Sequence, residues 1–137
     1  APEGELSLDT VREAVSDVAR YDTYVAAEAL VTGDTARYLR ILEGLRDEGE
    51  ATTHLLFTIS NVLFVLGHGG YANKPTQLLV DKARRYPPAA IAQAISRAAA
   101  IDRTIKGVVV GEPWEEFAKL GLELHAAASA PATQGHR

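Results

Sequence analysis

Residues 54–66 read HLLFTISNVLFVL, and this stretch decides the fold because apolar side chains occur at nearly every position of it. A helix that is apolar on nearly all sides is typical of the interior of a helical domain. The stretch is about a dozen residues long and includes Thr58, Ser60 and Asn61, whereas a helix needs roughly 20 apolar residues to span a bilayer. We therefore expect the central helix of a bundle here, and neither a membrane segment nor a signal peptide.

Three shorter helices are predicted before the central one. Ser7 can cap the first, which has an apolar stripe over residues 8–18. Asp22 can cap a short second helix that Gly33 ends. Asp34 can cap the third, and Gly49 closes it because glycine tolerates the backbone conformation that terminates a helix.

Two helices are predicted directly after the central one. The glycines and the proline of GHGGYANKP cannot continue a helix, so this stretch is a loop, and a helix over about residues 76–85 follows it. An alanine-rich helix then begins at Pro88 or Ala89 and continues to Lys106, where Gly107 ends it.

The last helix begins at Pro113, a favourable residue for the first helical position. Trp114 and Phe117 lie on its inner face, and Leu42 and Leu45 share the apolar face of the helix that Asp34 caps. We predict these four side chains as core residues. The fold class is all-α, a helical bundle of about six helices, with no strand and no internal repeat.

Composition indicates one globular domain, because 47% of the 137 residues are apolar and 23% are charged. We place this helical domain at residues 7–127, after a linker remnant at residues 1–6 and before a flexible tail at residues 128–137. The absence of methionine and the loose start APEGE suggest a piece of a longer protein. The net charge of -4 means that the domain as a whole repels nucleic acid, so any DNA contact must be local.

The sequence contains neither the histidine spacing of a helical metal site nor a cysteine nucleophile. The absence of cysteine excludes thiolate zinc sites and thiol nucleophiles, and it fits a reducing compartment, with the cytoplasm as the default localisation. The four histidines are scattered, and no pair has the i, i+4 spacing with a nearby acid that a helical metal site uses. LGHGGYANKP lacks the strand-to-helix context of a phosphate-binding loop. We expect no cofactor.

Two clusters of charge have a structural explanation. Glu115 and Glu116 lie in the first turn of a helix, where the helix dipole favours acidic side chains. Lys82, Arg84 and Arg85 lie at the end of a helix, where the dipole favours basic ones. Because neither cluster forms a catalytic arrangement, we expect that the chain is not an enzyme.

Asp102, in the stretch AAAIDRTIKG, lies on the apolar stripe of the alanine-rich helix, where a carboxylate needs a partner. Lys106 follows four residues later, but such a helical pair contributes only about 0.3 to 0.5 kcal/mol. Two alternatives stay open. Asp102 has a partner within this domain, or it accepts charge-assisted hydrogen bonds at an interface, where they fix register more than they add stability.

Residues 17–50, DVARYDTYVAAEALVTGDTARYLRILEGLRDEGE, resemble the signature of the C-terminal domain of the delta subunit of the bacterial DNA polymerase III clamp loader. That signature has an Ala-Arg-aromatic-Asp start, an Ala-Leu-x-x-Gly-Asp turn and a helix that ends in Glu-Gly. Later motifs follow in the family's order. The matching segments are residues 19–22, 29–34, 36–49, 55–57 and 100–107, and Trp114. The family often has arginine and glutamate midway along the central helix, where this chain has residues 61–64, so no polar contact is carried over from there.

The resemblance implies a collar domain that assembles DNA replication machinery and binds no clamp itself. Its partners would be the equivalent domains of the gamma or tau and delta-prime subunits, in the five-membered collar of the complex that loads the sliding clamp on primed DNA. The resemblance implies that Asp102 and Lys106 lie at a subunit interface. It also places Val109, in the loop 107–112, near the primer-template junction, which the domain would meet only in the assembled complex. The alternative for the valines of this loop is packing onto the bundle.

A second function class also fits the sequence. An unrelated all-helical ligand-binding or regulatory domain would have its apolar pocket beside the nearly all-apolar central helix. The full-length gene distinguishes the two hypotheses, because a collar domain requires ATPase-like sequence upstream of it.

Overall fold

The computed structural model describes residues 23–129, and all regular structure in this range is helical. Residues 23–32 are helical, and five further helices follow. They are α2 (Thr35–Asp47), α3 (Thr52–His68), α4 (Lys74–Lys82), α5 (Pro88–Ile105) and α6 (Pro113–Ser129). Residues 23–129 contain no strand, so the predicted all-α bundle of about six helices is confirmed. Within that range, no helix is long and apolar enough to cross a membrane.

The helix boundaries predicted from Asp34, Gly49 and Gly107 are confirmed. The Asp34 carboxylate accepts a hydrogen bond from the backbone N–H of Arg37 and so caps α2. Gly49 follows the end of α2 with a φ of 77°, and its N–H donates to the Arg46 carbonyl. Gly107 terminates α5 in the same way, with a φ of 79°. Both ends have the paired hydrogen bonds that satisfy the last carbonyls of a helix.

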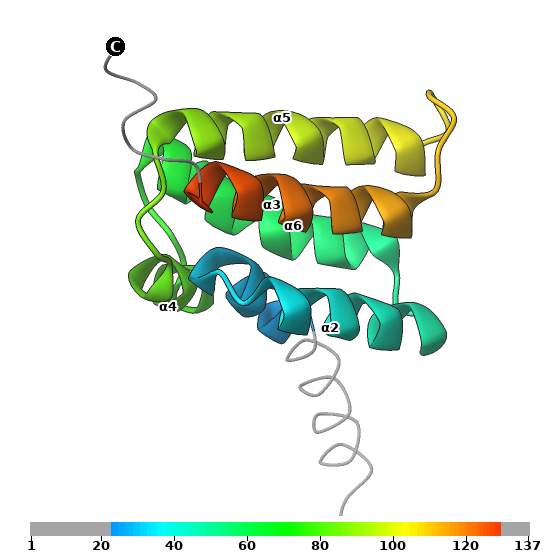
Figure 1. Ribbon diagram of the computed structural model, residues 1–137, viewed down its shortest axis with the longest axis horizontal. Coiled ribbons are helices and arrows are strands. Elements are labelled where there is room, and N and C mark those ends of the chain that lie inside the picture. The colour runs from blue at the N-terminus through cyan, green and yellow to red at the C-terminus, as the bar shows by residue number, and fades with distance from the viewer. Residues whose placement is uncertain (1–22, 130–137) are drawn as a thin grey trace, which may run out of the picture.

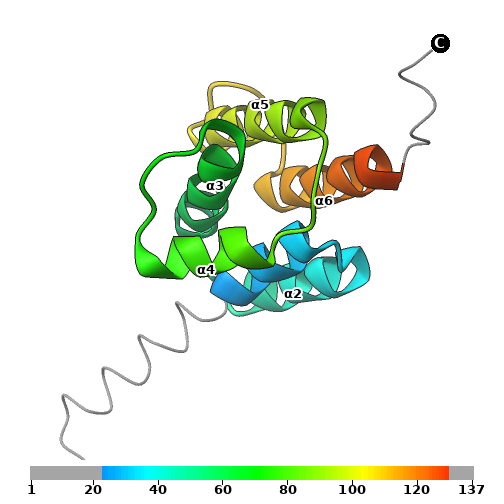
Figure 2. The same cartoon turned by 90° about the vertical axis from the view of Figure 1, so that its left-hand side faces the viewer.

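The helices surround a core that α2, α3 and α6 supply with its largest side chains. Figure 2 views the bundle from one end and shows α5 flanked by α3 and α6, with α2 and α4 on the opposite side of the core. Tyr38, Phe117, Leu55 and Leu63 are fully buried, and Leu42 and Leu45 are buried as well. Figure 1 shows that α3 and α5 run side by side, and that the loop joining α5 to α6 projects beyond the bundle.

The contact between α2 and α6 is close because α6 has a glycine where the helices meet. A Cβ atom at Gly121 would lie 2.5 Å from Cε2 of Tyr38. The Tyr38 hydroxyl donates a hydrogen bond of 2.8 Å to the Phe117 carbonyl, so its polar atom is satisfied in the core. Burial raises the pKa of Tyr38 far above its ordinary value, and the hydroxyl therefore remains a neutral donor.

The structure corrects the boundaries predicted for α4. The helix runs from Lys74 to Lys82 rather than over residues 76–85. Asn73 caps it by accepting a hydrogen bond from the Thr76 N–H, and Pro75 fits within the first turn, where a missing N–H costs nothing. The chain becomes extended at Ala83 and passes through Pro87 into α5.

Two other predictions concern the ends of the chain. Helix α6 continues to Ser129, so the first two residues of the tail predicted at 128–137 are helical. The linker at residues 1–6, the helix over residues 8–18 and the cap at Asp22 lie outside the described residues.

Candidate interaction surface

An open apolar groove runs along the surface where α3 and α5 pack together. Its volume is about 430 Å³. Phe57, Ser60 and Phe64 line it from α3, and Ile95, Ala98 and Asp102 line it from α5. Phe57 is 66% exposed and Phe64 is 56% exposed, which corrects the expectation that the central helix is covered on nearly all sides.

The spacing of residues along the two helices produces the groove. Phe57, Ser60 and Phe64 recur every three or four residues and therefore share one face of α3, beside the buried Leu56 and Leu63. The opposing wall of α5 contributes Ala98 and Ala99, whose small side chains leave space in front of the phenylalanines.

A second hollow of about 400 Å³ continues the groove toward the start of α5. His68, Tyr86 and Ile91 line it, and Ile95 lines both hollows. The ring of His68 lies 4.4 Å from that of Phe64, centroid to centroid, so the two hollows share a continuous aromatic edge. We call the two hollows together the α3–α5 trough. It follows α5 from Pro88 to Asp102, which is about 21 Å at 1.5 Å per residue.

Asp102 lies on the wall of this trough at the end nearest the α5–α6 loop. Its Oδ2 atom is 2.9 Å from the Lys106 Nζ, and the two side chains are 43% and 66% exposed. An exposed pair of this kind adds little stability. The structure thus brings Asp102 and Lys106 together, and it places the carboxylate against an open apolar surface rather than in the core.

The loop between α5 and α6 exposes its apolar residues. Val108, Val109 and Val110 are all exposed, and Val110 is fully so. Val109 is the most covered of the three, at 43% exposed. The sequence already set the loop apart, because glycines at 107 and 111 enclose it.

The chain is similar to DNA polymerase III subunit delta of Escherichia coli strain K12. The two are 36% identical over 85 residues, which are 61% of this chain and 25% of that subunit. The chain thus spans about a quarter of the length of the curated relative that it matches. No family model matches the chain, and no solved structure matches it. The matched relative is a delta subunit, and the motifs described from sequence resemble the delta-subunit family.

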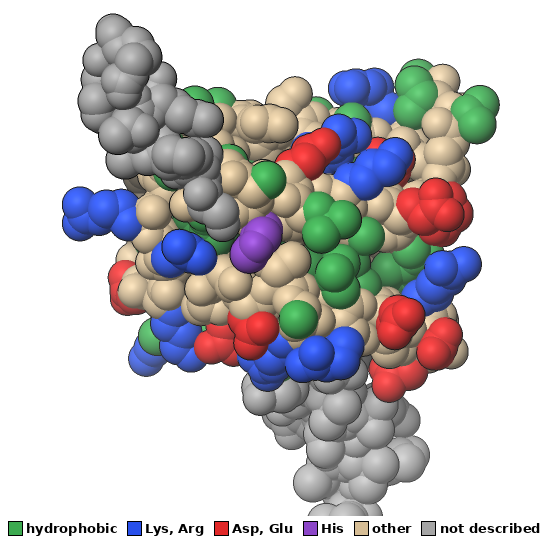
Figure 3. Space-filling model, in the orientation of Figure 1, with side chains coloured by type: hydrophobic (Ala, Val, Ile, Leu, Met, Phe, Trp, Pro, Cys, Tyr) green, Lys and Arg blue, Asp and Glu red, His purple; other side chains and the backbone are tan. Residues whose placement is uncertain are grey.

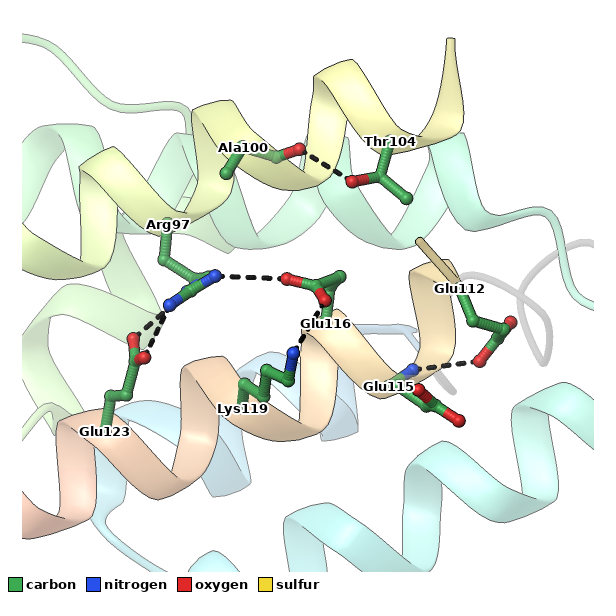
Figure 4. Close-up of polar contacts among 8 residues, drawn as sticks. All are labelled: Arg97, Ala100, Thr104, Glu112, Glu115, Glu116, Lys119 and Glu123. Carbon is green, nitrogen blue, oxygen red and sulfur yellow. Dashed lines mark hydrogen bonds and ion pairs between the residues drawn. The ribbon is translucent and has the colours of Figure 1, made fainter. Parts of the chain in front are cut away.

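Ion pairs bridge α5 and α6 on the other side of α5 (Figure 4), beside a hollow of about 250 Å³. The Arg97 guanidinium donates to both carboxylate oxygens of Glu123, at 3.1 and 2.6 Å, and to Glu116 at 3.0 Å. Lys119 donates to the second oxygen of Glu116. The hydrogen bonds to Glu123 raise the pKa of Arg97, with Glu116 adding to the effect, although partial burial opposes it. The Arg97 contacts thus join α5 to α6.

The end of α4 and the segment after it contact the end of the helical residues 23–32. The Arg84 N–H donates to the Val31 carbonyl, and the Tyr86 hydroxyl donates to the Leu30 carbonyl. Lys82 pairs with Glu28 at 2.8 Å. A backbone N–H and a tyrosine hydroxyl thus satisfy two carbonyls at the end of the helical residues 23–32. Helix α4 ends at Lys82, so Arg84 and Arg85 lie beyond the helix end at which the sequence placed them.

The histidines within the described residues are far from forming a common site. His54 contacts Glu50 at 2.8 Å, and His125 contacts Thr35 at 3.1 Å. His68 lies against Phe64. Across residues 23–129 no three or more histidine or acidic side chains lie close enough to hold a metal ion. His136 lies outside the described range.

Trp114 differs from the other three side chains predicted as core. Phe117 is fully buried, whereas Trp114 is only partly buried and lies 6.0 Å from the Phe117 ring, centroid to centroid. It borders a shallow hollow between α2 and α6, together with Leu39 and Ala118. Figure 3 shows hydrophobic side chains gathered on this face, surrounded by acidic and basic ones.

Sequence reasoning missed the two exposed phenylalanines. The signal was present, because the central helix has apolar residues on more sides than its neighbours in this chain can cover. A helix that is apolar on most sides is either buried completely within its own domain or covered on one face by another molecule. Both arrangements produce the same sequence pattern.

Proposed function

We propose that this chain is the collar domain of a clamp-loader delta subunit, an assembly domain that joins the gamma or tau and delta-prime subunits. The observation that carries the proposal is the 36% identity to the Escherichia coli delta subunit over 85 residues. The ordered motifs from residues 19–22 to Trp114 and the all-helical fold support it. In this role the domain holds neighbouring subunits in place and performs no chemical step.

The exposed surfaces also favour an assembly role. The α3–α5 trough exposes two phenylalanines, and exposed apolar patches are typical of surfaces that bind other proteins. The α5–α6 loop exposes three valines beside Lys106. In the proposed complex, Val109 acts as an apolar wedge at the primer-template junction, and Lys106 is the nearest partner for a phosphate.

Mixing experiments test the proposal. The chain is incubated with the gamma or tau and delta-prime subunits of the same organism and analysed by size-exclusion chromatography. We expect it to co-elute with the complete mixture and not with the sliding clamp. Labelled primer-template should show no change in fluorescence anisotropy with the chain alone at physiological salt, because the net charge is -4. Tight binding of the clamp by this chain would contradict the assignment.

The groove itself favours one other function, the binding of an apolar small molecule. Its volume of about 430 Å³ lies within the range of small-molecule sites, and its lining is mostly apolar. Under this alternative the chain would bind an apolar dye with a defined stoichiometry and would not join the clamp-loader mixture. The chromatography experiment therefore distinguishes the two functions.

A further inference from the structure

The α3–α5 trough has the shape of a seat for one helix. It lies between two helices that run side by side, and its length of about 21 Å corresponds to about four helical turns. Its apolar side chains recur along one face of each helix, and such a surface matches an apolar stripe repeated every three or four residues on a third helix.

Charge defines one end of the trough. Asp102 lines the hollow nearest the α5–α6 loop, and His68 lines the hollow at the opposite end. Lys106 contacts the Asp102 carboxylate from the solvent side in an exposed pair that is easily replaced. A lysine or arginine on a docked helix that displaced Lys106 would pair with the Asp102 carboxylate.

We propose that the α3–α5 trough binds an amphipathic helix of a neighbouring clamp-loader subunit, with a lysine or arginine of that helix contacting Asp102. The inference rests on the proposed function and adds to it the face that is used and the chemistry of the partner. Phe57 and Phe64 are the apolar anchors of the contact, and Asp102 fixes the register of the docked helix.

Within residues 23–129, α4 and α6 each expose a single large apolar side chain outside the trough, Leu78 and Leu122. Neither of these two helices therefore offers the exposed apolar stripe that the trough requires. The amphipathic helix predicted over residues 8–18 lies outside the described residues, and a second copy of the chain is therefore one outcome of the test below.

The test compares variants of the trough with matched variants elsewhere. Phe57→Ser and Phe64→Ser remove the exposed anchors, and Leu122→Ser removes a similarly exposed apolar side chain from α6. Asp102→Arg reverses the charge in the trough, and Asp47→Arg reverses an exposed charge at the end of α2. Each variant is titrated against the immobilised gamma or tau and delta-prime mixture, and its thermal melt is recorded to show that it is folded.

We expect each trough variant to weaken binding at least about tenfold, and we expect the two control variants to bind as the unaltered chain does. If the unaltered chain binds but trough and control variants behave alike, the trough inference fails and the proposed function stands. If the unaltered chain does not bind, the proposed function fails. If the unaltered chain forms a dimer that Phe57→Ser dissociates, the occupant is a second copy and the inference is wrong.

Cross-linking identifies the partner helix directly. Because the chain has no cysteine, Ser60→Cys creates a single thiol in the trough, and Glu43→Cys creates a control thiol on the exposed side of α2. A photo-reactive label at position 60 should attach to one helix of a partner subunit that has a lysine or arginine near the Asp102 end. Replacing that basic residue with glutamate should restore binding of the Asp102→Arg variant. Attachment to an acidic or irregular segment would overturn the inference.

Discussion

Each side of α5 borders a hollow, and the two hollows differ in the side chains that line them. Toward α6, Arg97 bridges Glu116 and Glu123, and Phe117 fills the core behind the hollow. Toward α3, small alanines face two exposed phenylalanines across an open trough. The comparison shows that one helix can have an ion-paired polar side and an open apolar side, and that the apolar side is the one suited to a protein partner.

The largest expected difference is between two phenylalanines. Phe117→Ala should lower the free energy of unfolding by about 3 to 5 kcal/mol, because it leaves a cavity in the core. Phe57→Ala should change it by less than about 0.5 kcal/mol, because that ring is already mostly in water. Chemical denaturation of the two variants measures both values. Similar losses for the two would show that Phe57 is covered in the isolated chain.

The sequence predicted the parts of the fold that local chemistry determines. Asp34, Gly49 and Gly107 mark helix ends because their caps are formed by neighbouring residues, and the structure has all three. The start of α4 was missed because a cap at Asn73 and a proline in the first turn look like a loop in sequence. A helix cap can therefore be recognised from sequence when an apolar stripe follows it, and it is mistaken for a turn when glycines and a proline surround it.

The candidate site was predicted only in part, because it depends on packing between distant helices. The apolar stripe of α5 places Asp102 correctly beside Ile95 and Ala98, and periodicity alone suffices for that. Periodicity does not say which neighbour covers each face of α3, so the exposure of Phe57 and Phe64 was not foreseen. Trp114 was expected in the core and is only partly buried, since α2 leaves a hollow beside it.

The second prediction concerns the closed contact between α2 and α6. Tyr38→Phe should lower the free energy of unfolding by about 1 to 3 kcal/mol, because the Phe117 carbonyl loses its buried hydroxyl donor. The ring of Tyr38 against Gly121 is unchanged in this variant, so packing does not contribute to the loss. Urea denaturation measures the effect, and Tyr71→Phe, at a highly exposed tyrosine, is the matched control. Equal stability of the two variants would contradict a closed contact here.

The third prediction tests the ion pairs that join α5 to α6. Arg97→Met keeps most of the aliphatic stem and removes three hydrogen bonds to Glu116 and Glu123. We expect a loss of about 1 to 2 kcal/mol at low salt, since partly buried charge-assisted bonds are stronger than exposed pairs. The loss should shrink at high salt because screening weakens the pairs in the unaltered chain. Arg103→Met, at an exposed position on the same helix, should cost less than about 0.5 kcal/mol. Indistinguishable melts of the two variants would mean that the α6 side is held by packing alone.

The smallest expected effect is at Asp102, on the open side of the same helix. Asp102→Asn removes the charge that pairs with Lys106, and an exposed i, i+4 pair is worth about 0.3 to 0.5 kcal/mol. The melting temperature of the isolated Asp102→Asn chain should therefore be almost unchanged, whereas that of the Arg97→Met chain should fall. A loss above about 1 kcal/mol would mean that Asp102 stabilises the folded domain itself. Near-equal stability together with weakened binding to the clamp-loader subunits would instead assign the carboxylate to an interface, because only there would its charge meet a group that this chain lacks.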